Sequence, residues 1–295
     1  MLTDHLTKPI SPKLFLGMFL ITIGAEITLY LNRYSYFFST IYDAIMIVAF
    51  FIGIKLNDRL NLEGNKSSFS EKLFLFFMVS SIFITGSILS DLYTSNLFKD
   101  FNNSYIDYVE SYSDSISIME DSGLEKYPGA ESASIFDTID LIGYDLYTDL
   151  LAGLEEVWRL SYIIFILLLC KFFFPIQWNS GKRDRFLLTS VFMTSILFGM
   201  GHALSSETDW QITIGTVVTY SNMGLLFALL LLWSRSLWTC VIVHSLYDVT
   251  ATLSYHYVEY AVLYYLLLSI LGMIVISVIK RLKDKNQVPT VTKDV

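Results

Sequence analysis

Residues 151–170 read LAGLEEVWRLSYIIFILLLC, an apolar stretch that nevertheless contains Glu155, Glu156 and Arg159. A helix needs about 20 mostly apolar residues to cross the hydrocarbon core of a membrane. Runs of this kind recur along the chain, at 13–31, 35–54, 72–90, 147–175, 186–204, 211–234, 237–256 and 258–279. The sequence therefore predicts an all-α polytopic membrane protein, with about eight transmembrane helices around a polar intramembrane cavity.

Composition supports the same class. Of the 295 residues, 54% are hydrophobic and 16% are charged, which departs strongly from an average soluble domain. We expect one multi-pass membrane domain over residues 1–280 and a polar cytoplasmic tail over 281–295. No cleavable signal sequence is evident, because no small-residue cleavage site follows the first apolar run. The bilayer is the expected surrounding, and no nucleic-acid partner is expected.

Basic residues in the connecting segments predict the orientation. They cluster between the second and third spans, between the fourth and fifth, and after the last, in the ranges 55–72, 171–185 and 280–285. The positive-inside rule assigns these segments to the cytoplasmic face of the cell membrane. With an even number of spans, both termini would be cytoplasmic. Arg33, in the first external turn, is the exception.

The segment 91–140 is strongly acidic, with eleven Asp and Glu residues against only Lys99 and Lys126. We expect it to be an extracytoplasmic loop. Tyr105, Tyr108 and Tyr112 give part of it an amphipathic pattern, so short interfacial helices are an alternative to a solvated loop.

Charged groups inside a span are costly, at about 2.5–3.5 kcal/mol each near the bilayer centre on insertion scales. Glu155 lies four residues before Arg159 and Glu156 three residues before it, so helical spacing predicts that the guanidinium reaches both carboxylates. One carboxylate would remain without a compensating charge and could act as a general base. The alternative is an ion pair that only locks the helix bundle together.

Two further spans contain paired polar residues. TSILFGMGHAL (194–204) has Phe198 and His202 four residues apart, and Gly199 and Gly201 leave room for a neighbouring helix. SLWTCVIVHSLYDVT (236–250) has His244 and Asp248 four residues apart on one helix face. Polar side chains on three separate spans indicate a functional site rather than packing alone.

These motifs, EEVWR, FGMGH and HSLYD in that order, resemble the CPBP family of CAAX-processing and bacteriocin-processing intramembrane endopeptidases. The resemblance covers about residues 147–255. It implies an eight-helix fold around a water-filled cavity in which a glutamate and a histidine activate water to cleave a peptide bond. The implied substrate is a membrane-associated peptide or a lipidated or leader-bearing protein, and no cofactor is expected.

Carried over residue by residue, the resemblance implies a role for each polar group. Glu155 would be the general base, and Glu156 and Arg159 would orient it. His202 would hold the attacking water. His244 and Asp248 would stabilise the oxyanion.

Two departures from the family pattern leave alternatives open. EEVWR has two residues between Glu156 and Arg159 where the family usually has three, as in the related PrsW-type Glu-Glu-x-x-Lys motif, so either glutamate could be the base. Asp248 stands where Asn is common, and an ionised Asp would repel an oxyanion. Asp248 is therefore protonated, or it orients His244, or a divalent metal such as zinc is bound by Glu155, His202, His244 and Asp248. Metal-free catalysis is the preferred hypothesis.

The order of the spans also predicts the depth of the site. His202 would lie at the outer end of its span, and Glu155 in the outer part of its own. We therefore expect the site in the outer half of the membrane, beneath the acidic loop, where it would act on an exported or membrane-embedded peptide.

Other classes of membrane protein leave different patterns. The chain has no His-Glu-x-x-His motif of zincins, no Gly-x-Ser-Gly of rhomboid proteases and no Gly-x-Gly-Asp of presenilin-type proteases. A non-catalytic scaffold, or a bacteriocin-immunity or signalling protein of the same fold, remains the alternative. A third possibility is a transporter with a relay of acidic groups, Glu26, Asp43, Glu155, Glu156 and Asp248. We expect Glu26 and Asp43 to pair with Arg33, or else to face the same cavity.

Overall fold

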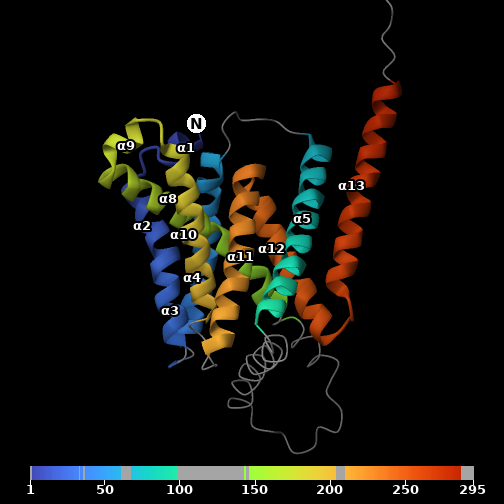
Figure 1. The fold of residues 1–295 in the computed structure, drawn as a ribbon, viewed down its shortest axis with the longest axis horizontal. Helices are drawn as coiled ribbons and strands as arrows, with labels where there is room; N and C mark the ends of the chain where they lie inside the picture. Colours follow the sequence, from blue (N-terminus) through green and yellow to red (C-terminus); the bar gives the residue numbers. More distant parts are fainter. Residues whose placement is uncertain are drawn as a thin grey trace, which may run out of the picture.

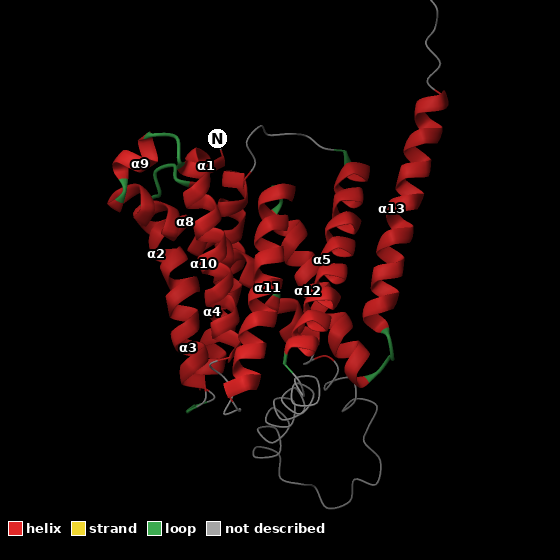
Figure 2. Cartoon of the chain, viewed as in Figure 1, coloured by secondary structure: helices red, strands yellow, loops and turns green. Residues whose placement is uncertain are grey.

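The structure is a computed structural model that describes residues 2–32, 34–35, 37–60, 68–98, 143, 146–203 and 210–286. Within these ranges the chain forms helices joined by short turns, and no strand occurs (Figure 2). The predicted all-α class is confirmed. Each of the eight apolar runs contains helix, because a backbone in lipid must satisfy its own hydrogen bonds.

The first half of the bundle begins with a short helix, α1 (Leu2–Leu6). One continuous helical segment follows, in which α2 (Pro12–Phe19), a π-helical turn η1 (Leu20–Gly24) and α3 (Ala25–Asn32) succeed each other. Two long helices complete this half, α4 (Phe37–Leu60) and α5 (Phe69–Leu97).

The second half contains the three predicted motifs. Its helices are α8 (Glu155–Phe173), α9 (Pro175–Asn179), α10 (Arg183–Ala203), α11 (Trp210–Ser234), α12 (Leu237–His256) and α13 (Ala261–Asn286) (Figure 1).

Five helical segments are long and apolar enough to cross a membrane by length and composition, which supports a membrane-embedded multi-pass protein. They are Pro12–Leu31, Phe37–Leu60, Phe69–Leu97, Ile212–Ser234 and Ala261–Lys283. The exact number of eight spans stays a prediction.

One end of the bundle gathers the N-terminus, α9 and the final turns of α13 (Figure 1). Arg59, in the last turn of α4, holds the end of α1 there, because its guanidinium donates hydrogen bonds to the carbonyls of Leu6, Lys8 and Pro9. Arg183 forms an ion pair with Asp4 at the same end. The basic connecting segments thus share one end of the molecule, as the positive-inside argument requires, while the membrane face on which they lie remains a prediction.

Hydroxyl pairs join α5 to its neighbours. The Ser80 hydroxyl lies 2.8 Å from that of Tyr265 on α13, and the Ser87 hydroxyl 2.6 Å from that of Tyr247 on α12. The Thr219 hydroxyl of α11 donates to that of Thr94 at 2.8 Å. Hydrogen bonds of this kind are the usual polar connections between membrane helices.

The predicted span 147–175 is not one continuous helix. A helix over 146–152 ends in turn residues at Gly153 and Leu154, and α8 begins at Glu155. Gly153 lies against α12, where a Cβ would come within 2.4 Å of the Val241 carbonyl. The Ser245 hydroxyl of α12 donates to the Leu150 carbonyl at 2.8 Å. The break therefore places Glu155 at a helix start within the predicted span.

Two helices continue beyond the apolar runs that predicted them. Helix α5 continues to Leu97, past the predicted start of the acidic loop at residue 91, and α13 continues to Asn286, past the predicted start of the tail at 281. Ser95 and Asn96 donate to the carbonyls four residues earlier, so these polar side chains fit a helix that leaves the apolar layer. The rest of the acidic loop, including Tyr105, Tyr108 and Tyr112, and also Arg33, lie outside the described residues.

Candidate active site

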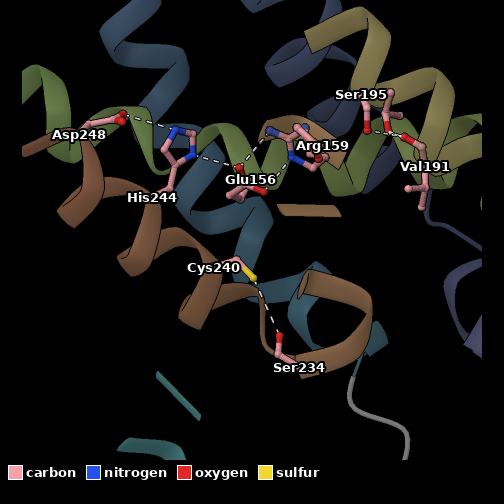
Figure 3. Close-up of polar contacts among 10 residues, drawn as sticks. Glu156, Arg159, Val191, Ser195, Ser234, Cys240, His244 and Asp248 are labelled. Carbon is pink, nitrogen blue, oxygen red and sulfur yellow. Dashed lines mark hydrogen bonds and ion pairs between the residues drawn. The ribbon is translucent and has the colours of Figure 1, made fainter. Parts of the chain in front are cut away.

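Glu156 and Arg159 form a bidentate ion pair in the first turns of α8 (Figure 3). The Nε of Arg159 lies 2.9 Å from Oε2 of Glu156, and Nη2 lies 3.1 Å from Oε1. Glu156 has no exposed surface and Arg159 has 3%. The prediction that Arg159 reaches both carboxylates is wrong, because the guanidinium fork is occupied by Glu156 alone.

Helices α10 and α11 hold the other side of Arg159. Its Nη1 donates to the Gly224 carbonyl at 3.2 Å, and its guanidinium carbon lies 4.2 Å from the centre of the Phe198 ring. A Cβ at residue 224 would come within 2.8 Å of Nη1. Glycine at this position therefore allows Arg159 to pass between the helices.

His244 continues the chain of contacts to α12. Its Nδ1 lies 3.0 Å from Oε1 of Glu156, and its Nε2 lies 3.4 Å from Oδ2 of Asp248 (Figure 3). The ring also stacks on Phe227 of α11, with 4.6 Å between the centres. Of the three alternatives for Asp248, this contact agrees best with a carboxylate that orients His244.

Asp248, His244, Glu156 and Arg159 together are called the buried network below, in which Asp248 is the outermost member with 26% of its side chain exposed. Each ring nitrogen of His244 faces a carboxylate, so a doubly protonated ring would donate to both. Two carboxylates, one imidazolium and one guanidinium would then carry no net charge. A balanced set of this kind is the form in which charges are tolerated away from water.

Glu155 faces a different part of the molecule. It lines a small pocket of about 30 Å³, together with Glu26, Trp158, Arg159, Tyr162, Thr194, Leu197 and Phe198. Within the described part of the chain, the Glu155 carboxylate has no hydrogen bond or ion pair. The two adjacent glutamates therefore differ. Both carboxylate oxygens of Glu156 accept from Arg159 or His244, whereas the Glu155 carboxylate faces the pocket.

His202 lies one turn after Phe198 on α10. Its Nδ1 lies 2.9 Å from the Phe198 carbonyl oxygen, which can only accept. Nδ1 therefore carries the proton, and in the neutral ring Nε2 has the lone pair. The ring stacks on Tyr220 of α11 at 4.1 Å. His202 is not among the residues that line the pocket.

The Phe198 ring lies between the two histidine rings. Its ring centre lies 4.4 Å from that of His202 and 6.5 Å from that of His244. The phenylalanine of the predicted Phe-x-x-x-His motif thus separates His202 from the buried network and covers Arg159. The structure brings all six predicted site residues into one region, on α8, α10 and α12.

The two glycines of FGMGH have different surroundings. A Cβ on Gly199 would lie 2.4 Å from the Val217 carbonyl of α11, so α10 and α11 approach closely there, as expected. A Cβ on Gly201 would meet only the Glu26 carboxylate, at 3.8 Å. Gly201 therefore lies beside the pocket rather than against a packed helix.

The residues proposed for a metal site do not assemble into one. Across the described ranges, no three His, Cys, Asp or Glu side chains are grouped so that they could hold a metal ion. Glu155, His202, His244 and Asp248 thus lack the arrangement of a zinc centre. Cys170 and Cys240 are both free.

The sequence interpretation missed three residues of α11 that support the site: Tyr220, Gly224 and Phe227. Their spacing of four and three residues places them on one helix face. That periodicity was available in the sequence, but Tyr, Gly and Phe at helical spacing are common in packed membrane helices and do not by themselves indicate a site.

Comparison with protein families gives one match. The family model described as "Type II CAAX prenyl endopeptidase Rce1-like" matches residues 155–250. The match begins at Glu155, includes the three motifs and confirms the predicted resemblance to the CPBP family. It indicates a protease-type hydrolase, and the apolar helices indicate that this protein is embedded in a membrane. Neither the curated proteins nor the solved structures gave a match.

Proposed function

We propose that this Rce1-like protein is an intramembrane endopeptidase that hydrolyses a peptide bond through water activated by Glu155. The observation that supports the proposal most is the difference between the two glutamates. Glu156 is held by Arg159 and His244, whereas the Glu155 carboxylate faces a pocket with no protein partner among the described residues. A general base needs such a free carboxylate within reach of a water molecule.

In the proposed reaction, Glu155 takes a proton from water as the water oxygen bonds to the scissile carbonyl carbon. The carbonyl oxygen becomes an oxyanion in the tetrahedral intermediate. The C–N bond then breaks, and the proton held by Glu155 passes to the leaving amine. The resemblance assigns the attacking water to His202 as well, and because His202 does not line the pocket, its part in the reaction is tested by the His202→Ala variant.

Donors for the oxyanion would come from the buried network. Arg159 lines the pocket beside Glu155, and its Nη1 contacts only a backbone carbonyl, at 3.2 Å. The Nε2 of His244 lies 3.4 Å from Asp248, which is longer than a normal hydrogen bond. His244 does not line the pocket, so in this proposal Arg159 is the donor to the oxyanion, and His244 and Asp248 hold Glu156 and thereby Arg159 in place.

The position of the site along the bundle bears on the substrate. Helix α10 ends at Ala203, just after His202, at the end of the bundle opposite the N-terminus (Figure 1). If the basic end is cytoplasmic, the site lies in the outer half of the membrane. The proposed substrates are then membrane-associated, lipidated or leader-bearing chains that reach the site from the extracytoplasmic side.

A non-catalytic scaffold of the same fold is the second candidate, and the buried network itself favours it. A balanced set of charges between α8 and α12 would also hold two helices together without any chemistry. The two candidates differ at Glu155, which contributes to no such contact. A scaffold would keep its function without the Glu155 carboxylate.

The test is to reconstitute the full-length protein in liposomes and identify peptide products by mass spectrometry. Wild type is compared with Glu155→Gln, Glu156→Gln and His202→Ala, with Asp43→Asn as a control for loss of a membrane carboxylate outside the pocket. We expect products from wild type and Asp43→Asn and a loss of about 100-fold or more in Glu155→Gln. Retained cleavage in all three site variants would remove the assignment.

The same preparation tests for a metal. Cleavage by wild type is measured before and after treatment with a chelator. The metal-free proposal predicts no change. Loss of cleavage that zinc restores would replace it with metal-dependent catalysis.

A further inference from the structure

Trp158 lines the same pocket as Glu155, about one turn further along α8. The residue is 7% exposed, and its indole Nε1 is buried with no hydrogen-bond partner among the described residues. Tryptophan can only donate through this N–H group. Buried donors are nearly always hydrogen-bonded, to the protein or to ordered water. The Trp158 N–H therefore indicates an acceptor that the described part of the chain does not supply.

The indole is held beside Glu155 by its neighbours. One face of α8 forms the pocket wall, with residues spaced by three, four and seven: Glu155, Trp158, Arg159 and Tyr162. The Tyr42 ring of α4 lies edge-on against the indole, with 5.8 Å between the ring centres and 89° between the planes. Such edge-to-face contacts favour one orientation of the two rings. The donor is thus fixed on the wall that also holds the Glu155 carboxylate.

The pocket has the size and the partners of a water site. Its volume is about 30 Å³, and a water molecule needs about 10–15 Å³ together with polar partners. The Trp158 N–H is a donor and the Glu155 carboxylate an acceptor. On α10, the Thr194 hydroxyl donates to the Val191 carbonyl at 2.9 Å, so its oxygen can accept as well. One ordered water would satisfy the indole and both acceptors.

We propose that Trp158 is a further catalytic residue, whose indole N–H binds the water molecule that Glu155 activates. This inference rests on the proposed peptidase function. The water oxygen accepts from Nε1 with one lone pair and donates a hydrogen to the Glu155 carboxylate. Its second lone pair is then free to bond to the scissile carbonyl carbon. Trp158 and Glu155 together fix the direction of attack.

The indole also acts while the charge develops. As Glu155 takes the proton, the water oxygen gains hydroxide character, and the N–H donor stabilises it. The proton passes from the water to Glu155 and later to the leaving amine, so Trp158 neither gains nor loses one. This role differs from that of Arg159, which donates to the oxyanion formed from the carbonyl oxygen.

A structure determined at a resolution that shows water molecules tests the binding directly. We expect a water oxygen within hydrogen-bond distance of both the Trp158 Nε1 and the Glu155 carboxylate. A pocket without that water, or an Nε1 that donates to a protein group or a lipid, overturns the inference. This measurement does not depend on cleavage.

Kinetics in liposomes test the catalytic part. Trp158→Phe keeps an aromatic ring and removes the N–H. We expect kcat to fall about tenfold with KM nearly unchanged, because the lost hydrogen bond is made to the attacking water and not to the peptide. Trp178→Phe is the matched control: Trp178 is 3% exposed and stacks on Phe186, away from the pocket. It should cleave like wild type.

A second variant covers a Trp158→Phe protein that folds poorly. Replacing the Trp158 indole by benzothiophene, through incorporation of β-(3-benzothienyl)alanine, keeps the shape and removes the N–H donor. We expect the same loss of kcat with unchanged thermal unfolding. A wild-type kcat in this variant overturns the inference. Absence of any wild-type product overturns the proposed function instead, and the structure still decides whether Trp158 binds water.

Discussion

The first turns of α8 separate two regions that differ in the hydrogen bonding and the exposure of their charged side chains. Toward α11 and α12, Glu156, Arg159 and His244 fill each other's hydrogen bonds and are nearly inaccessible. Toward α3 and α10, Glu155 and Glu26 face a pocket without partners among the described residues. The polar groups of the buried network bind one another, whereas the two pocket carboxylates contact no polar partner within the described ranges. In the proposed mechanism, stability and chemistry are thus divided between adjacent residues of one motif.

The largest stability effect should come from Arg159→Met. The substitution leaves the Glu156 carboxylate buried with only His244 as a partner, and breaking a buried ion pair on one side costs about 3–5 kcal/mol. We expect a correspondingly lower unfolding free energy in detergent micelles. Glu155→Gln is the matched change on the pocket side and should alter it by less than about 0.5 kcal/mol. Equal losses of unfolding free energy in Arg159→Met and Glu155→Gln would contradict the proposal that the buried network, and not the pocket, stabilises the fold.

The glycines of α10 give the next comparison. Gly199→Ala would push a Cβ to 2.4 Å from the Val217 carbonyl, where backbone cannot move away cheaply. We expect a loss of about 1–3 kcal/mol, the range for overpacked interiors. Gly201→Ala meets nothing closer than 3.8 Å and should leave the unfolding free energy unchanged. A Gly199→Ala variant as stable as wild type would show that α10 and α11 are packed less tightly than the 2.4 Å approach implies.

Two tyrosines provide the smallest expected effect. The Tyr247 hydroxyl lies 2.6 Å from that of Ser87 between α12 and α5, and Tyr247→Phe should cost about 0.6–1.7 kcal/mol, as membrane hydrogen bonds do. Tyr162 lines the pocket, and no described residue hydrogen-bonds its hydroxyl. Tyr162→Phe should therefore be neutral in thermal unfolding. A destabilised Tyr162→Phe protein would mean that the pocket side also contributes to folding.

Much of the fold could be predicted from hydropathy, because helices are the one way to satisfy the backbone of each apolar run. The break at Gly153 could not be predicted, since it depends on close contact with the Val241 carbonyl of another helix. Helices α5 and α13 continue to Leu97 and Asn286, because polar residues end an apolar run without ending the helix.

For the site, spacing paired Glu156 with Arg159 and His244 with Asp248 in the prediction, because residues three and four apart share a helix face. That the two pairs meet was predicted from the cost of charges in the membrane and from the resemblance, not from spacing. Spacing could not decide which glutamate pairs with Arg159, since both lie within reach along the helix. Contacts with other helices favour Glu156: His244 of α12 binds the Glu156 carboxylate, and the Gly224 carbonyl of α11 accepts from Arg159. Glu26 could not be placed, because its position depends on where α3 lies relative to α8 and α10, whose residues line the pocket with it.

The most direct test of the central claim is a paired measurement on purified Glu155→Gln and Glu156→Gln in liposomes, with peptide cleavage and thermal unfolding recorded on the same samples. The account predicts that Glu155→Gln unfolds like wild type but loses cleavage by about 100-fold or more, whereas Glu156→Gln is destabilised. A stable Glu155→Gln protein that cleaves at the wild-type rate would contradict it.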